Sequence, residues 1–132
     1  MNLGAISMRY ARALLMFAND AGVAAKVYHE ALMLRKSFRE VPELRSAMEK
    51  PVMTYENKLL LLKQAAGGEI TKQMQKFLAL VLQEKREKYL MGINQSFIDL
   101  YRKQEKIHVG KLTTAVPIKP EEVERIRRIV VE

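Results

Sequence analysis

The chain has 132 residues, and 48% of them are hydrophobic, which suffices for one domain, or one domain plus a fragment, with a buried core. It contains no cysteine, which excludes disulfides, thiolate metal ligands and a cysteine nucleophile. The formal net charge is +8, but lysines and arginines alternate with glutamates, a pattern typical of solvated helix faces rather than of one concentrated polyanion site.

The first predicted helix covers Leu3 to Asp20 and ends near Gly22, because glycine is common just past a helix C-terminus. Its main apolar stripe consists of Leu3, Ile6, Tyr10, Leu14 and Phe17. Further apolar or small residues lie outside this stripe, so the helix is apolar on most sides. Two interpretations stay open: a central helix buried all round, or one that packs on its own domain and also lines a binding groove.

Three more helices follow in the predicted order. The second runs from Val23 to Val41, and its apolar stripe comprises Val27, Ala31, Leu34, Phe38 and Val41. Pro42 suits the first turn of a short third helix. Thr54 is a predicted N-cap for the fourth, which ends at Gly67-Gly68.

The fifth helix, predicted from Thr71 to Glu87, carries a leucine that its core face does not explain. The stripe that follows helical spacing consists of Met74, Phe77, Leu78, Val81 and Leu82. At about 100° per residue, Leu80 points roughly 130° away from the centre of that stripe. Either another helix or a partner is therefore expected to cover Leu80.

The sixth helix is predicted to follow a charged junction at Lys85 to Lys88. Its inward-facing residues are Leu90, Ile93, Phe97, Leu100 and Tyr101. Gly92 weakens this helix locally by about 1 kcal/mol relative to alanine.

From Ile107 to Val116 the β-branched residues lose helical period and predict a strand, which Pro117 ends before a further helix begins at Lys119. A lone strand leaves its edges unpaired, so we infer an incomplete second domain. The predicted fold is all-α: a six-helix N-terminal bundle at 1–106, followed at 107–132 by the first strand and helix of an incomplete α/β C-terminal domain.

No catalytic constellation is found in the sequence. His29 and His108 lack metal-ligand partners at suitable spacing, and Gly67-Gly68 does not belong to a phosphate-binding loop. No apolar run approaches the length of a transmembrane helix. We therefore predict no catalytic residue, no metal, no cofactor and no enzymatic activity.

Several motifs in order resemble the delta subunit of F-type ATP synthases. The first is Arg9 to Leu14 (RYARAL), followed by Phe17-Ala18. The later ones are Pro51, Lys58, Leu61 and Leu62, then Phe77-Leu78 through Arg86, Phe97 and Leu100, and finally Leu112 to Ile118 with Glu122 and Ile126. The resemblance covers essentially the whole chain. Glu87 departs from it, because an apolar residue usually follows the arginine, and the family's C-terminal glycine-containing strands and last helix are absent.

The resemblance implies a stator subunit without chemistry of its own. In that family the first and fifth helices of a six-helix bundle grip the N-terminal helix of one alpha subunit of the catalytic head, and the C-terminal domain meets the b subunits of the peripheral stalk. The residues expected to contact the alpha-subunit helix are Tyr10, Ala13, Leu14, Phe17, Lys76, Phe77, Leu80 and Glu84.

The resemblance also implies a peripheral location at the cytoplasmic face of a bacterial inner membrane, no nucleic-acid partner, and a monomer when isolated. Two alternatives remain. The charge of +8 motivates an all-helical RNA-binding bundle, and apolar positions outside the stripes motivate a scaffold that self-associates.

Overall fold

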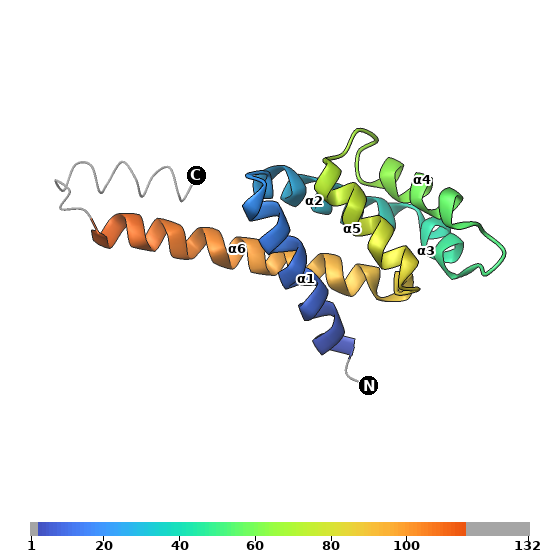
Figure 1. Ribbon diagram of the computed structural model, residues 1–132, viewed down its shortest axis with the longest axis horizontal. Coiled ribbons are helices and arrows are strands. Elements are labelled where there is room, and N and C mark those ends of the chain that lie inside the picture. Colours follow the sequence, from blue (N-terminus) through green and yellow to red (C-terminus); the bar gives the residue numbers. More distant parts are fainter. Residues whose placement is uncertain (1–2, 116–132) are drawn as a thin grey trace. The chain divides into compact units, whose positions relative to one another are not determined.

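A computed structural model describes residues 3–115 of the chain, and this part is all-helical (Figure 1). The helices are α1 (Leu3–Asp20), α2 (Ala24–Glu40), α3 (Pro42–Glu49), α4 (Tyr55–Ala65), α5 (Lys72–Gln83) and α6 (Leu90–Ala115), with a 3-10 turn, η1 (Glu87–Tyr89), before α6. Six helices in this order agree with the predicted bundle. By its contacts the chain divides into two compact units, Met1–Tyr101 and Arg102–Glu132, and the bundle described below belongs to the first.

The helix starts follow the capping residues that the sequence offers. The hydroxyl oxygen of Thr54 accepts the N–H of Asn57 at 3.2 Å, and that of Thr71 accepts the N–H of Met74 at 3.1 Å. Both threonines thus satisfy a backbone donor that the first turn of a helix leaves without an intrahelical partner. Pro42 occupies the first turn of α3, as predicted, because its fixed φ suits that position and its missing N–H is not needed there.

The core draws on every helix of the first unit except α3 for its most deeply buried large side chains. These are Leu14, Val27, Leu34, Leu62, Met74, Leu78, Val81, Leu90, Ile93, Phe97 and Ile98. Helix α5 contacts α1, α2 and α4, so it lies at the centre of the packing and its position is fixed from three sides (Figure 1). Val41 was predicted to face the core, but it caps the end of α2 and is 42% exposed.

The N-terminal part of α6 is fastened to the bundle by close polar and aromatic contacts. The buried Asn94 amide donates to the Ala31 carbonyl of α2 at 2.9 Å, and the rings of Tyr28 and Tyr101 stack with centroids 4.3 Å apart. Gly92, which the sequence suggested only as a weak point, has a packing role. A Cβ at Gly92 would lie 2.8 Å from Oγ of Ser7 on α1, so glycine lets the two helices approach.

The predicted strand from Ile107 to Val116 is wrong over the residues that the structure describes, because α6 continues as a helix to Ala115. A helix pairs its backbone N–H and C=O groups within the segment, whereas a strand needs a neighbour, and none is present among residues 3–115. The preference of β-branched residues for strands is weak against that requirement. The helix predicted from Lys119 lies outside the described residues, and the functional division at residue 107 stays a prediction.

Helices α1 and α4 end in the same way. In each, the N–H groups of a glycine and of the residue after it donate to carbonyls of the last helical turn. After α1, the N–H of Gly22 (φ 70°) donates to the carbonyl of Asn19 at 3.0 Å, and the next N–H donates to Ala18 at 2.9 Å. Gly67 (φ 130°) takes the corresponding place after α4. This is the Schellman arrangement, in which glycine is favoured because the residue after the cap has a positive φ. Both endings confirm the prediction from sequence.

Helix α5 ends in the same arrangement with a lysine in place of the glycine. The N–H of Lys85 donates to the carbonyl of Leu82 at 3.1 Å, and the N–H of Arg86 donates to Val81 at 2.9 Å. Lys85 has φ 58°, and it is the one non-glycine residue with positive φ among the described residues. A left-handed conformation costs an L-residue about 1–2 kcal/mol, so α5 ends under strain.

We expect Lys85→Gly to raise the free energy of unfolding by about 0.5–1 kcal/mol. Relief of the left-handed strain is offset in part by the greater freedom of glycine in the unfolded chain. Urea unfolding followed by circular dichroism measures the change. Lys85→Ala is the control, since alanine keeps a Cβ and hence the strain. A stability of Lys85→Gly at or below that of Lys85→Ala would contradict the assignment.

Candidate docking groove

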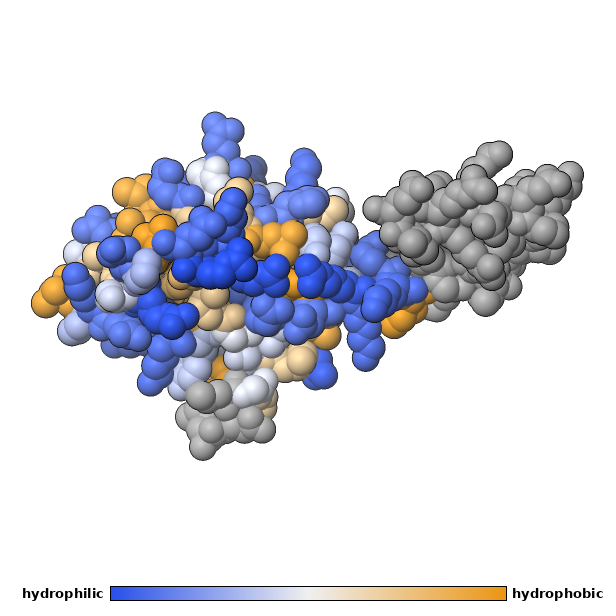
Figure 2. Space-filling view, turned by 180° about the vertical axis from the view of Figure 1, so that it is seen from behind, coloured by the Kyte–Doolittle hydropathy of each residue, from blue (hydrophilic) through white to orange (hydrophobic). Residues whose placement is uncertain are grey.

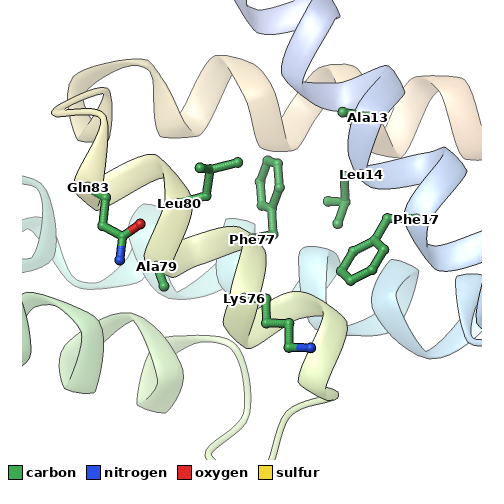
Figure 3. Close-up of a pocket in the computed structure, with 8 residues that line it drawn as sticks. All are labelled: Ala13, Leu14, Phe17, Lys76, Phe77, Ala79, Leu80 and Gln83. Carbon is green, nitrogen blue, oxygen red and sulfur yellow. The ribbon is translucent and has the colours of Figure 1, made fainter.

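An apolar groove of about 490 Å³ lies between α1 and α5 (Figure 3). Its residues from α1 are Ala13, Leu14 and Phe17, and those from α5 are Lys76, Phe77, Ala79, Leu80 and Gln83. Leu14 and Phe17 project from α1 toward α5, and Phe77 and Leu80 lie beside each other on one side of α5 (Figure 3). The two walls belong to helices that contact each other directly, so the groove is part of the folded bundle.

The α5 wall is held from its N-terminus. The Glu30 carboxylate of α2 accepts the backbone N–H of Thr71 at 2.6 Å and its hydroxyl at 2.8 Å, so the start of α5 is tied to α2. The opposite side of the helix buries Leu78 and Val81 completely, which turns Leu80 outward with 42% of its surface exposed. The orientation of Leu80 is therefore dictated by the core side of the same helix.

The α1 wall combines a buried leucine side chain with an exposed aromatic ring. Leu14 is 1% exposed and reaches the core, whereas Phe17, one turn further on, is 40% exposed at the groove. Ala13 is exposed, and on the facing wall Ala79 is equally small. Two alanines on opposite walls leave room for the backbone of a helix between the larger apolar side chains.

Six of the eight residues predicted to contact a partner helix line this groove together: Ala13, Leu14, Phe17, Lys76, Phe77 and Leu80. Tyr10 is not among the lining residues, and its side chain packs in the core with 9% of its surface exposed. Glu84 is exposed at the C-cap of α5, just beyond the lining. Sequence reasoning missed Ala79 and Gln83. Gln83 follows Lys76 by seven residues and Leu80 by three, and this helical spacing could have identified it.

The groove carries little charge and no reactive group. Lys76 is the only charged residue among its lining residues, and no side chain there is a nucleophile beside a base. Across the part of the chain that the structure describes, no cluster of three His, Asp or Glu residues could hold a metal ion. His29 lies exposed on α2, and the side chain of His108 is outside the described set. The arrangement is suited to binding an apolar surface.

Exposed apolar side chains also occur singly outside the groove. Met16, Val52 and Leu60 are 67%, 87% and 57% exposed. The face shown in Figure 2 is mostly hydrophilic, with hydrophobic areas that are small and separate. Isolated exposed apolar residues are ordinary on protein surfaces, so the groove is distinguished by its shape and by facing apolar walls.

Over residues 3–115, none of the helices has the length and hydropathy that crossing a bilayer requires.

The described residues thus form a helical bundle with an apolar groove between two of its helices. A model of the ATP synthase delta (OSCP) subunit family matches residues 6–132. The chain is 50% identical over 133 residues to an ATP synthase subunit delta from Phocaeicola vulgatus, covering 100% of this chain and 72% of the relative. It is 43% identical over 129 residues to the subunit from Bacteroides thetaiotaomicron, covering 96% and 69%. The chain therefore belongs to the ATP synthase delta (OSCP) subunit family.

Family membership confirms the resemblance found in the sequence motifs, and it makes the chain a non-catalytic subunit of ATP synthase. A relative from Lactobacillus acidophilus, 31% identical over 121 residues, carries the same subunit name. Nothing in these matches supports the RNA-binding alternative.

Proposed function

We propose that this chain is a stator subunit that links the catalytic head of an F-type ATP synthase to its peripheral stalk, and that the groove between α1 and α5 grips the N-terminal helix of one alpha subunit. The observation that carries this proposal is the pair of half-exposed apolar side chains, Phe17 and Leu80, that face one groove from two helices. The C-terminal region would meet the b subunits, at the cytoplasmic face of a bacterial inner membrane.

The shape and chemistry of the groove support a helical occupant. An amphipathic helix docks by placing apolar anchors at helical spacing into a groove, and the lining offers apolar contacts on both sides of such an anchor row. Phe17, Phe77 and Leu80 supply large apolar surfaces, while the small residues of the two walls allow the occupant to lie deep. Lys76 stands at the rim, where it can pair with an acidic side chain of the occupant.

A stator must resist torque, and the packing of the walls suits that task. Helix α5 is buried against three neighbours and tied at its first turn by Glu30. A rigid wall loses little conformational entropy when a helix docks, so more of the contact energy is retained as affinity. No chemical step is required of the chain.

A peptide that copies an alpha-subunit N-terminus tests the proposal. Titrated into the ¹⁵N-labelled full chain, it is expected to shift amide resonances of α1 and α5 selectively, and the free chain is expected to sediment as a monomer. A peptide of the same composition in scrambled order, which has no apolar face, is the control. Shifts confined to other helices, or equal shifts with the scrambled peptide, would reject the groove as the docking site.

A further inference from the structure

A second cavity, of about 340 Å³, lies around the strained Lys85 at the end of α5. Besides Lys85, its lining consists of Pro51, Met53, Tyr55, Lys58, Leu82 and Glu87. These residues come from the loop after α3, from α4, from the last turn of α5 and from the junction between α5 and α6. The cavity shares no lining residue with the docking groove, and Leu82 and Leu80 are two residues apart and so point to different sides of α5.

The charges of this cavity leave one cation unmatched. Lys58 is neutralised internally, because its ammonium lies 3.3 Å from the Glu87 carboxylate and donates to the Met48 carbonyl at 3.1 Å. The side chain of Lys85 has no ion pair or hydrogen bond within residues 4–107, and it is exposed. The lining therefore presents a net positive charge beside the phenol of Tyr55, which can donate a hydrogen bond.

The backbone conformation of Lys85 is unusual for a residue with a side chain. Two other helices of this bundle end in the same arrangement and place glycine at the position of positive φ, whereas α5 places a lysine there. Strained backbone conformations of this kind cluster at binding and catalytic sites, where the surrounding structure holds them in place, so the outlier motivates a hypothesis of function. At the end of α5, what the lysine adds over glycine is a positive charge at the mouth of the cavity.

The positive charge of Lys85 favours an anionic group in the ligand, and the apolar remainder of the lining favours an apolar group next to it. Leu82 is 6% exposed, and Pro51 and Met53 form the adjoining wall in the loop after α3. Val52, between them, is 87% exposed and extends the apolar surface outward. A free inorganic anion would gain nothing from these side chains, whereas an acidic residue next to an apolar one in a peptide would use both parts.

We propose that this cavity is a second protein-docking site, which receives an acidic side chain of a partner's peptide segment at Lys85 and Tyr55 while an adjacent apolar side chain of that segment lies against Leu82 and Met53. The site is independent of the groove between α1 and α5. The peptide segment proposed for this cavity is anchored by a carboxylate, whereas the helix proposed for the groove is anchored by apolar side chains.

The tripeptide acetyl-Phe-Asp-Leu-amide probes the site by NMR titration of the ¹⁵N-labelled full chain. Amide shifts are expected at Met53, Tyr55 and Lys85, with affinity about three- to tenfold higher than for the Asn tripeptide, which has the same shape without the charge. Lys85→Gly is expected to lower the affinity by a similar factor while it raises the unfolding midpoint, and Lys85→Arg is expected to retain binding.

Three outcomes would overturn the proposal. Equal affinity for the Asp and Asn tripeptides would show that the carboxylate is not recognised. Unchanged affinity in Lys85→Gly would show that the lysine does not contribute to binding. Acetate alone producing the same shifts at the same concentration would make this a site for small carboxylates rather than for a peptide segment. None of these results bears on the docking groove, because Leu80 and Phe17 are untouched in each variant.

Discussion

Replacing Leu80 with lysine is expected to weaken binding of an alpha-subunit N-terminal peptide by about 1–2 kcal/mol, which is roughly a five- to thirtyfold rise in Kd. Leu80 is 42% exposed in the free chain, and a helix in the groove would remove that apolar surface from water. A lysine at this position must either lose hydration or extend its ammonium past the occupant, and both reduce affinity. Isothermal titration calorimetry on the full chain measures the change.

Leu60→Lys is the matched control for this prediction. Leu60 is a surface leucine of α4 that is 57% exposed and does not line the groove. The same chemical change there should leave the affinity unaltered. If both variants bind as tightly as the parent chain and their melting temperatures are unchanged, Leu80 has no docking role. If Leu60→Lys weakens binding as much as Leu80→Lys, the occupant lies elsewhere or acts through charge alone.

The bundle was predictable because local patterns and tertiary packing agree along most of it. Threonines at 54 and 71, proline at 42 and glycine at 22 each have a local chemical reason to begin or end a helix, and each does so. The helical spacing of apolar residues alone predicted the core face of α5, and the complete burial of Leu78 and Val81 confirms it. Where the local pattern is strong, a lone sequence suffices to place the element.

The strand prediction failed because a strand needs a neighbouring strand, and residues 3–115 contain none. Residues 107–115 have the composition of a strand, yet they continue α6 as a helix. β-Propensity expresses packing against paired strands more than a backbone preference, so it loses its force without a pair. Helical hydrogen bonds, by contrast, need only the segment itself.

The α5 wall of the candidate groove was predicted from a residue that does not fit the core pattern. The α1 wall was predicted only in part, because sequence periodicity does not give the angle at which two helices cross. Leu80 lies off the core stripe of its helix, and that misfit identified the α5 wall. On α1, Tyr10 and Leu14 follow the same spacing, but only Leu14 reaches the groove. Periodicity tells which residues share a face, whereas the angle at which two helices cross decides which turn of that face meets the neighbour.

Lys58→Met is expected to lower the free energy of unfolding by about 2–3 kcal/mol, the largest stability effect that we predict for a single change. Lys58 is 8% exposed, and its ammonium is the partner of the Glu87 carboxylate at 3.3 Å. One oxygen of Glu87 is already buried without a hydrogen bond to any described residue. Removing the cation would leave a largely desolvated carboxylate uncompensated, which costs more than the ion pair itself contributes.

A second substitution separates that mechanism from a simple loss of packing. In the Lys58→Met background, Glu87→Leu removes the stranded charge and should recover most of the lost stability, since replacing both members of a buried pair by apolar residues is often nearly neutral. Lys36→Met, at an exposed position of α2, should change stability by no more than about 0.5 kcal/mol. If the double variant is as unstable as Lys58→Met, then the methylene chain of Lys58 rather than its charge holds α4 against the junction before α6, and Glu87 is not a partner on which the fold depends.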